Sequence, residues 1–254
     1  MTFDVVAEAY DRFMGRFSEP LADEFMAVAG LRPGQRVLDV GCGPGALTRR
    51  LVAALGADAV SAVDPSAPFV AAVQERCPGV DVRRASAEDL PFDADTFDVA
   101  LAQLVVHFMQ DPVAGLREMA RVTRPGGAVL ASVWDHAGDA GPLSTYWRAV
   151  RELDPGARDE SGLAGAAEGH LTELAVSAGL DDVQPSSLTV HVGFATFEDW
   201  WEPYTLGVGP AGVYVAGLGD EARAALRARC QQLLPPAPFE MAASAWCVVG
   251  RVPG

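Results

Sequence analysis

Short apolar runs alternate with amphipathic stretches along the first half of the chain. Short, mostly apolar runs are typical of buried strands, whereas apolar residues three or four positions apart indicate helices. These patterns predict strands at 36–40, 59–63, 80–84, 96–102 and 126–133, separated by helices at 46–55, 66–76 and 112–122. Single helices between consecutive strands predict a parallel sheet that is covered by helices on both faces.

Two more helices are predicted before the first strand, at 4–14 and 21–29. Ser18 is placed to cap the start of the second helix, and Gly30 to end it.

The pattern changes after residue 134. Residues 135–169 are rich in Gly, Pro and Asp, with a short aromatic helix expected around Tyr146 and Trp147. A helix at 171–178, a strand at 187–192, an aromatic helical stretch at 197–204, a helix at 220–234 and a last strand at 241–252 follow. Connections that leave parallel strands lie at the carboxyl edge of the sheet, where open α/β sheets bind ligands. The insertions 135–169 and 194–240 are therefore expected to cover that crevice as a cap.

Composition narrows the classes of partner. Among 254 residues there are 34 acidic and 19 basic side chains, all of the latter arginine, so the net charge is −15. Such a chain repels phosphate backbones, which argues against nucleic-acid binding through a general basic surface. The four cysteines have no metal-ligand spacing and are expected to be reduced thiols, and no metal site is predicted. Without a signal peptide or a long apolar run, a cytoplasmic protein with no membrane insertion is expected. The oligomeric state is not indicated.

A glycine-rich loop is the sharpest local feature. The sequence VLDVGCGPG at 37–45 places three glycines between a predicted strand and a predicted helix. Glycine permits positive φ and lets a ligand approach the backbone, and the free N–H groups at a helix start attract it further. Loops of this kind bind nucleotides in several families.

Two readings of this loop compete. Gly41-x-Gly43-x-x-Ala46, with Asp64 further on, fits the fingerprint of NAD-binding proteins. Asp39, however, would repel a pyrophosphate and suits a ligand that carries an ammonium or sulfonium group. The second half also lacks the repeated mononucleotide unit of a dinucleotide fold. An NAD-dependent oxidoreductase is therefore the weaker alternative, beside a catalytically silent module that only binds a cofactor.

Four motifs in order resemble the class I S-adenosylmethionine-dependent methyltransferases, nearest to the ubiquinone/menaquinone-biosynthesis type and to small-molecule methyltransferases. They are VLDVGCGPG (37–45), AVDPS (62–66), ASAEDLPFDADTFDVALA (85–102) and DPVAGLREMARVTRPGGAVLASV (111–133). The resemblance covers about residues 10–133. It implies an α/β, Rossmann-like seven-stranded sheet in the order 3-2-1-4-5-7-6, with the last strand antiparallel. The expected layout is one domain over 1–254: lid helices at 1–30, a cofactor-binding core at 31–134, cap insertions at 135–169 and 194–240, and the last strand at 241–254.

The resemblance also implies roles for individual residues. Asp39 and the loop would surround the methionyl part of S-adenosyl-L-methionine. Asp64 would accept hydrogen bonds from the ribose hydroxyls, and the neighbouring Pro65 is also expected to contact the cofactor. Ser86 and Ala87 fall at the adenine, where the family usually has Asp-Ala, and Gln103 falls beside the transferable methyl. Tyr10 and Arg16 would cover the cofactor, with Arg16 paired to its methionyl carboxylate. The loop positions that it implies are Gly41, Cys42, Gly43 and Gly45.

The acceptor is less constrained. Methyl transfer by in-line displacement depends mainly on positioning, and a general base is needed only for a hydroxyl or activated C–H acceptor. His107 and His136 follow predicted strands at the crevice and are the candidate bases, but the sequence does not assign the role to either. Most aromatic residues of the insertions are expected to pack the cap onto the sheet. Any that face a cleft favour a small apolar or aromatic acceptor.

Overall fold

A seven-stranded sheet forms the centre of the molecule. The computed structural model describes residues 7–254. The strands β1 (Val37–Val40), β2 (Val60–Asp64), β3 (Asp81–Arg84), β4 (Phe97–Gln103), β5 (Thr123–Trp134), β6 (Asp181–Phe194) and β7 (Phe239–Arg251) lie in the order β3-β2-β1-β4-β5-β7-β6. The first five are parallel, and β7 runs antiparallel to both of its neighbours. The predicted fold class and strand order are confirmed.

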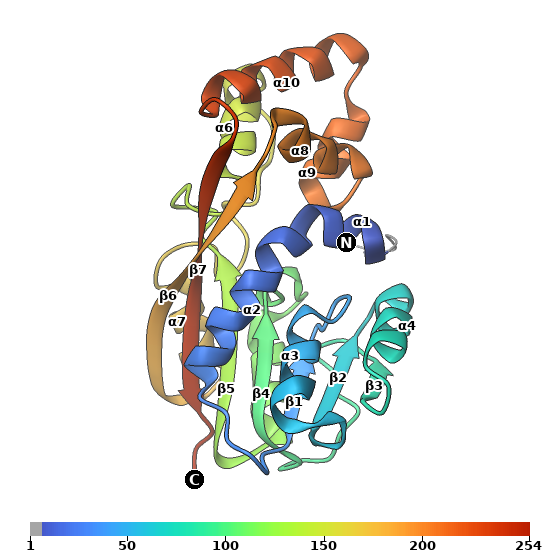
Figure 1. Ribbon diagram of the computed structural model, residues 1–254. Helices are drawn as coiled ribbons and strands as arrows, with labels where there is room; N and C mark the ends of the chain where they lie inside the picture. Colours follow the sequence, from blue (N-terminus) through green and yellow to red (C-terminus); the bar gives the residue numbers. More distant parts are fainter. Residues whose placement is uncertain (1–6) are drawn as a thin grey trace.

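Helices cover both faces of this sheet (Figure 1). Alternate strand residues point to opposite faces, so Val37 and Val99 share one core with the helices before and after β1, whereas Leu38 and Ala100 share the other. The first face is covered by α2 (Arg16–Ala29) and α3 (Ala46–Leu55), with α4 (Ala67–Arg76) toward its edge; the second is covered by α5 (Pro112–Val122) and α7 (His170–Ser177). The central strands β1, β2 and β4 are accordingly buried along most of their length, as a parallel sheet covered on both faces requires.

A long hairpin extends the sheet upward in Figure 1. Strand β6 runs over fourteen residues, whereas the sequence predicts only 187–192. Its exposed and buried residues alternate only from Leu188 onward, and residues 181–187 are mostly exposed. This first half is a strand because its backbone pairs with β7, which no hydrophobic alternation reports.

A group of helices stands above the carboxyl ends of the parallel strands (Figure 1). It contains α6 (Ser144–Leu153), α8 (Phe197–Trp201), α9 (Gly209–Gly217) and α10 (Asp220–Leu233), with the short turn η4 (Glu202–Leu206) after α8. Aromatic packing holds this group together: Tyr204 stacks on Tyr146 at 4.6 Å and lies 4.8 Å from Trp200. These three rings are buried, which agrees with the packing interpretation of the aromatic insertions.

The N-terminal segment is one continuous helical path. It comprises α1 (Ala7–Tyr10), a π-helical turn η1 (Asp11–Gly15) and α2, so Ser18 lies inside α2 and is buried, and its predicted capping role is wrong. Gly30 does end the helix, with φ of +56° and its N–H donating to the Met26 carbonyl. The part of the predicted first helix at 4–6 lies outside the described residues. No helix within 7–254 combines the length and apolar character needed to span a membrane.

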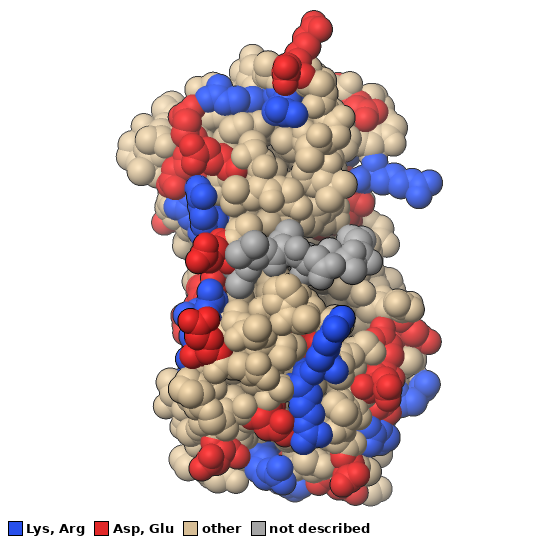
Figure 2. All heavy atoms as spheres, turned by 90° about the vertical axis from the view of Figure 1, so that its right-hand side faces the viewer, with Lys and Arg blue, Asp and Glu red and all other residues tan. Residues whose placement is uncertain are grey.

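Charged groups are mixed on the face shown in Figure 2, where arginines are interspersed with Asp and Glu side chains. No field of a single sign occupies this face.

Candidate functional site

The glycine loop folds back onto the end of β2. The N–H groups of Gly41 and Cys42 both donate to the Val63 carbonyl, at 2.8 and 3.0 Å, and the Gly43 N–H donates to Asp64 Oδ2 at 2.9 Å. The loop glycines have φ values of +69° (Gly41), +53° (Gly43) and +97° (Gly45), a region that favours glycine. A Cβ on Gly43 would meet no atom within 4 Å, so the backbone is open to a ligand there.

Two buried carboxyl groups lie beside this loop. Asp39 is 1% exposed and accepts a 2.6 Å hydrogen bond from the Thr48 hydroxyl, while Asp64 also accepts the Ser66 N–H at 2.8 Å. Burial, opposed by the Thr48 hydrogen bond and reinforced by the charge of Asp64, raises the pKa of Asp39 to about 7. Burial also raises the pKa of Asp64, against the two backbone donors. No basic side chain is among the groups that shift the pKa of either acid, so a cationic ligand would stabilise their ionised forms.

The loop borders a cavity of about 30 Å³, here called the glycine-loop cavity. Two buried polar atoms at its wall, Ser18 Oγ and Gln103 Oε1, have no hydrogen-bond partner among the described residues. The amide nitrogen of Gln103 donates to the Ser18 carbonyl at 2.8 Å. Buried polar atoms are nearly always satisfied in proteins, so these two point to a polar ligand. The lining residues include Tyr10, Ser18, Asp39, Gly41, Cys42, Gly43, Gln103 and Leu104.

Six of the predicted cofactor contacts do not line this cavity: Gly45, Asp64, Pro65, Ser86, Ala87 and Arg16. Ser86 is exposed in the turn after β3, and Ala87 is buried in the core. Pro65 is exposed, and its carbonyl accepts a 3.0 Å hydrogen bond from Arg84. Gly45 and Asp64 do not line the cavity either, but they shape it through hydrogen bonds within the loop.

Arg16 has a different partner from the one predicted. Its guanidinium donates to both carboxylate oxygens of Asp199, at 2.9 and 3.0 Å, and lies 4.5 Å over the ring of Phe194. These contacts hold Arg16 at the junction of β6 and α8, and it does not line the glycine-loop cavity. The structure therefore does not bring Arg16 to the predicted cofactor site, because a partner 183 residues away in sequence takes its charge.

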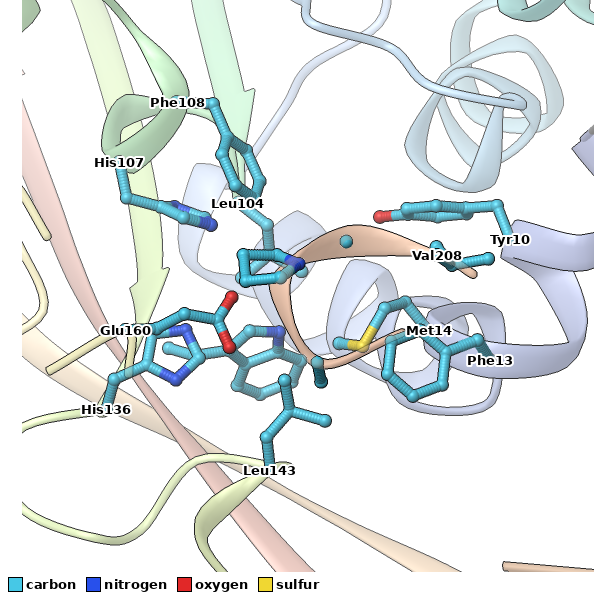
Figure 3. Close-up of a pocket in the computed structure, with 14 residues that line it drawn as sticks. Tyr10, Phe13, Met14, Leu104, His107, Phe108, His136, Leu143, Glu160 and Val208 are labelled. Carbon is cyan, nitrogen blue, oxygen red and sulfur yellow. The ribbon is translucent and has the colours of Figure 1, made fainter. Parts of the chain in front are cut away.

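A second cavity, of about 40 Å³, adjoins the first and is here called the histidine cavity (Figure 3). Tyr10 and Leu104 line both cavities, so they form the wall where the two meet. Leu104 has φ of +62°, a conformation that non-glycine residues rarely adopt and that occurs often at functional sites. Its N–H donates to the Ser132 carbonyl at 2.9 Å, which helps to hold it there. The remaining lining is largely apolar and includes Phe13, Met14, Phe108, Trp134, Leu143 and Val208.

Both candidate bases lie in the histidine cavity, with ring centroids 6.0 Å apart. Burial, and then the neighbouring His136, lowers the pKa of His107 well below its usual value, and burial lowers that of His136 to about 4. Both imidazoles are therefore neutral at pH 7 and are weak bases. The Nδ1 atom of His107 is buried and has no partner among the described residues.

A carboxyl group that the sequence did not single out shares this cavity. Glu160 is 5% exposed, and its Oε2 accepts a 2.8 Å hydrogen bond from the indole N–H of Trp147. Burial, opposed by that bond, raises its pKa to about 7. It lies in a polar connection between α6 and α7 that matches no motif, so no sequence signal marks it. Ser18 was likewise missed, because it was read as a helix cap.

The comparison with known protein families agrees with this geometry. A family model described as a methyltransferase domain matches residues 38–131. This chain contains a methyltransferase domain. The match confirms the resemblance that the four motifs predict. The methyltransferase domain carries the glycine loop, Asp39, Asp64, Gln103 and His107, whereas Tyr10, His136 and Glu160 lie outside it.

Relatives in sequence are methyltransferases of more than one kind. Malonyl-[acyl-carrier protein] O-methyltransferase from Erwinia billingiae is 34% identical over 146 residues, which are 58% of this chain and 57% of that protein. Demethylmenaquinone methyltransferase from Mycobacterium sp. strain KMS is 39% identical over 132 residues, 51% of this chain and 52% of that protein. The chain thus spans little more than half the length of these relatives.

A solved structure shares the fold around the methyltransferase domain. Phosphoethanolamine N-methyltransferase 2 from Haemonchus contortus, solved with S-adenosyl-L-methionine, aligns with a TM-score of 0.58 and 18% identity. The alignment covers 97% of this chain and 60% of that chain. At this identity the likeness shows the fold alone.

Proposed function

We propose that this chain transfers a methyl group from S-adenosyl-L-methionine to a small acceptor with an apolar or aromatic body. The observation that carries the proposal is the contact of two cavities across Tyr10 and Leu104. One is polar and acidic and lies at the glycine loop; the other is largely apolar. Because the two cavities enclose only about 30 and 40 Å³, side chains on their walls must move apart to admit a donor and an acceptor, which would then meet at the shared wall, the arrangement that in-line displacement needs.

The residues of the glycine-loop cavity fit this cofactor. Asp39 on the wall and Asp64 behind the loop are two buried acids that favour a ligand with positive charge. Ser18 Oγ and Gln103 Oε1 lack partners that its polar groups would provide. Each Asp64 oxygen already accepts one backbone N–H, but a carboxylate oxygen accepts a second bond, so both remain suited to ribose hydroxyls. When bound, the cofactor supplies a methyl on a sulfonium centre whose leaving group is a neutral thioether.

Isothermal calorimetry with S-adenosylmethionine, S-adenosylhomocysteine and NAD tests the cofactor. We expect both sulfur nucleotides to bind and NAD not to bind, because Asp39 would face its pyrophosphate. Binding of NAD without either sulfur nucleotide would overturn the proposal and favour an oxidoreductase.

The affinity for S-adenosylmethionine is expected to increase with pH. The pKa of Asp39 is about 7, so most of this carboxyl is protonated at pH 6 and ionised at pH 8. A cationic ligand binds the ionised form, and the ionised fraction rises about tenfold over that range, so the dissociation constant should fall by about tenfold. Calorimetry at pH 6, 7 and 8 measures this dependence. Asp39→Asn should flatten it, and Asp58→Asn, at an exposed position before β2, should not. An equally steep dependence in Asp39→Asn would exclude Asp39 as the titrating group.

A further inference from the structure

The histidine cavity has one acidic side chain on its wall, that of Glu160, and no side chain that is permanently positive. None of its lining residues is an arginine, and the chain contains no lysine. The ionisable groups with lowered or raised pKa on its wall are His107, His136, Glu160 and Tyr10. Figure 3 shows the Glu160 carboxyl turned toward the middle of the cavity, beside the ring of His136 and across from His107.

One oxygen of Glu160 is available to a ligand. Oε2 is held by the Trp147 indole, whereas Oε1 accepts no hydrogen bond from the residues that the structure describes. His107 Nδ1 is a second unsatisfied polar atom on the same cavity. In the tautomer that has its proton on Nε2, His107 Nδ1 accepts a hydrogen bond, and a ligand group that satisfies both atoms is then a hydrogen-bond donor that sits between them.

An anionic acceptor does not fit this lining. A carboxylate or phosphate in the histidine cavity would find no arginine or lysine to pair with and would face the ionised form of Glu160, and unpaired charges of like sign in a buried site are strongly unfavourable. The aromatic faces of Tyr10, Phe13 and Trp134 on the wall instead suit an apolar or cationic group. The charge of the wall thus leaves neutral and cationic acceptors.

Between these, an amine fits better than an alcohol. An alcohol must give its proton to a base in the transfer step, and the two imidazoles and Glu160, whose pKa is about 7, are all weak bases toward a hydroxyl. An amine nitrogen attacks with its own lone pair. It needs only to be deprotonated on arrival and to be stabilised as it gains positive charge, and a buried carboxylate does both.

We propose that the acceptor is a small organic amine with an apolar body, bound through its nitrogen by Glu160 and His107. This inference rests on the proposed methyl transfer. The ammonium ion gives one proton to the Glu160 carboxylate, which passes it on to water, so that the neutral amine is left in the cavity with its lone pair beside an ionised Glu160. The nitrogen then forms a bond to the methyl carbon as the carbon–sulfur bond breaks, and the bonding pair stays on sulfur. The product is a methylated ammonium ion that faces the Glu160 carboxylate.

The experiment uses matched acceptors with the wild-type chain. Benzylamine, phenethylamine and tryptamine are compared with the alcohol and carboxylate of the same carbon skeletons, as binding to the complex with S-adenosylhomocysteine and as turnover with S-adenosylmethionine. At least one amine should bind and be methylated, its alcohol should bind about tenfold more weakly or worse, and its carboxylate should not bind. Equal or tighter binding of an alcohol or carboxylate, or no binding of any amine, would overturn the proposal.

A charge-removing variant isolates Glu160. Glu160→Gln keeps the shape and an oxygen for the Trp147 indole, but it should weaken amine binding about thirtyfold, because one partner of a buried charge pair is lost. Glu168→Gln, in the same connection but exposed, serves as the control and should leave amine binding unchanged. Unchanged amine binding in Glu160→Gln would refute the role of Glu160. S-adenosylhomocysteine is expected to bind equally to the wild type and both variants. If the wild type does not bind it, the proposed methyl transfer is overturned. If the wild type binds it but shows no preference for amines, only the amine acceptor is overturned.

Discussion

The Asp64→Ala protein is expected to bind S-adenosylmethionine about a hundredfold more weakly and to unfold at a lower temperature. The side chain accepts the N–H groups of Gly43 and Ser66, so its loss leaves two backbone donors without an acceptor. Each unsatisfied donor costs about 1–3 kcal/mol, and a hundredfold change in affinity corresponds to about 2.7 kcal/mol. The ribose contacts that we propose for Asp64 would be lost as well. Calorimetry and thermal unfolding measure the two effects.

Asp64→Asn separates the two roles of this residue. The amide keeps one oxygen for a backbone donor, so the variant should be more stable than Asp64→Ala. It offers only one acceptor to two ribose hydroxyls, so its affinity for the cofactor should still fall. If Asp64→Ala binds the cofactor as tightly as the wild type, Asp64 holds neither the loop nor the ribose in the way described.

Gly41→Ala is expected to be the most destabilising of the loop substitutions. At φ of +69°, an added Cβ would stand 2.4 Å from Cγ2 and 2.6 Å from Cγ1 of Val105, a β-branched side chain with little freedom to move. Backbone strain of about 1–2 kcal/mol and overpacking of about 1–3 kcal/mol add together. The midpoint of urea unfolding should fall accordingly.

Gly43→Ala is the matched control for that prediction. Its φ is also positive, at +53°, but the added Cβ would meet nothing within 4 Å, so only the strain applies. The double variant Gly41→Ala with Val105→Ala should recover part of the lost stability, since it removes the clashing methyl groups. Equal stability of Gly41→Ala and Gly43→Ala would show that the contact with Val105 does not matter.

The centre of the site could be predicted from the sequence because its residues belong to short local motifs. The loop glycines, Asp39 and Asp64 are marked by their positions at the ends of two apolar runs, and parallel pairing of those runs brings them together. Five strands and the three helices between them could be predicted from the pattern of apolar residues alone. Helix α5 has the predicted bounds. The order of all seven strands comes from the family resemblance instead.

The rest depends on tertiary contacts that no local pattern encodes. Arg16 contacts Asp199 because α2 packs along β6, and no pattern in the sequence predicts that the two residues are close in space. In the sequence, Glu160 is one of several acidic residues in a polar connection. Its burial against Trp147 follows from the packing of the helical group, which the sequence does not show. The first half of β6 is polar and exposed, so its pairing with β7 leaves no periodic trace.

Because Tyr10 and Leu104 belong to both cavities, a donor that displaces either side chain would couple the occupancy of one cavity to that of the other. A donor that moves the tyrosine ring alters the surface that the acceptor meets. Thermodynamic reciprocity then requires the acceptor to change the affinity for the donor by the same factor. The order in which donor and acceptor bind, and the tendency of the spent donor to hold an unreacted acceptor, would then depend on one aromatic side chain and one leucine with positive φ.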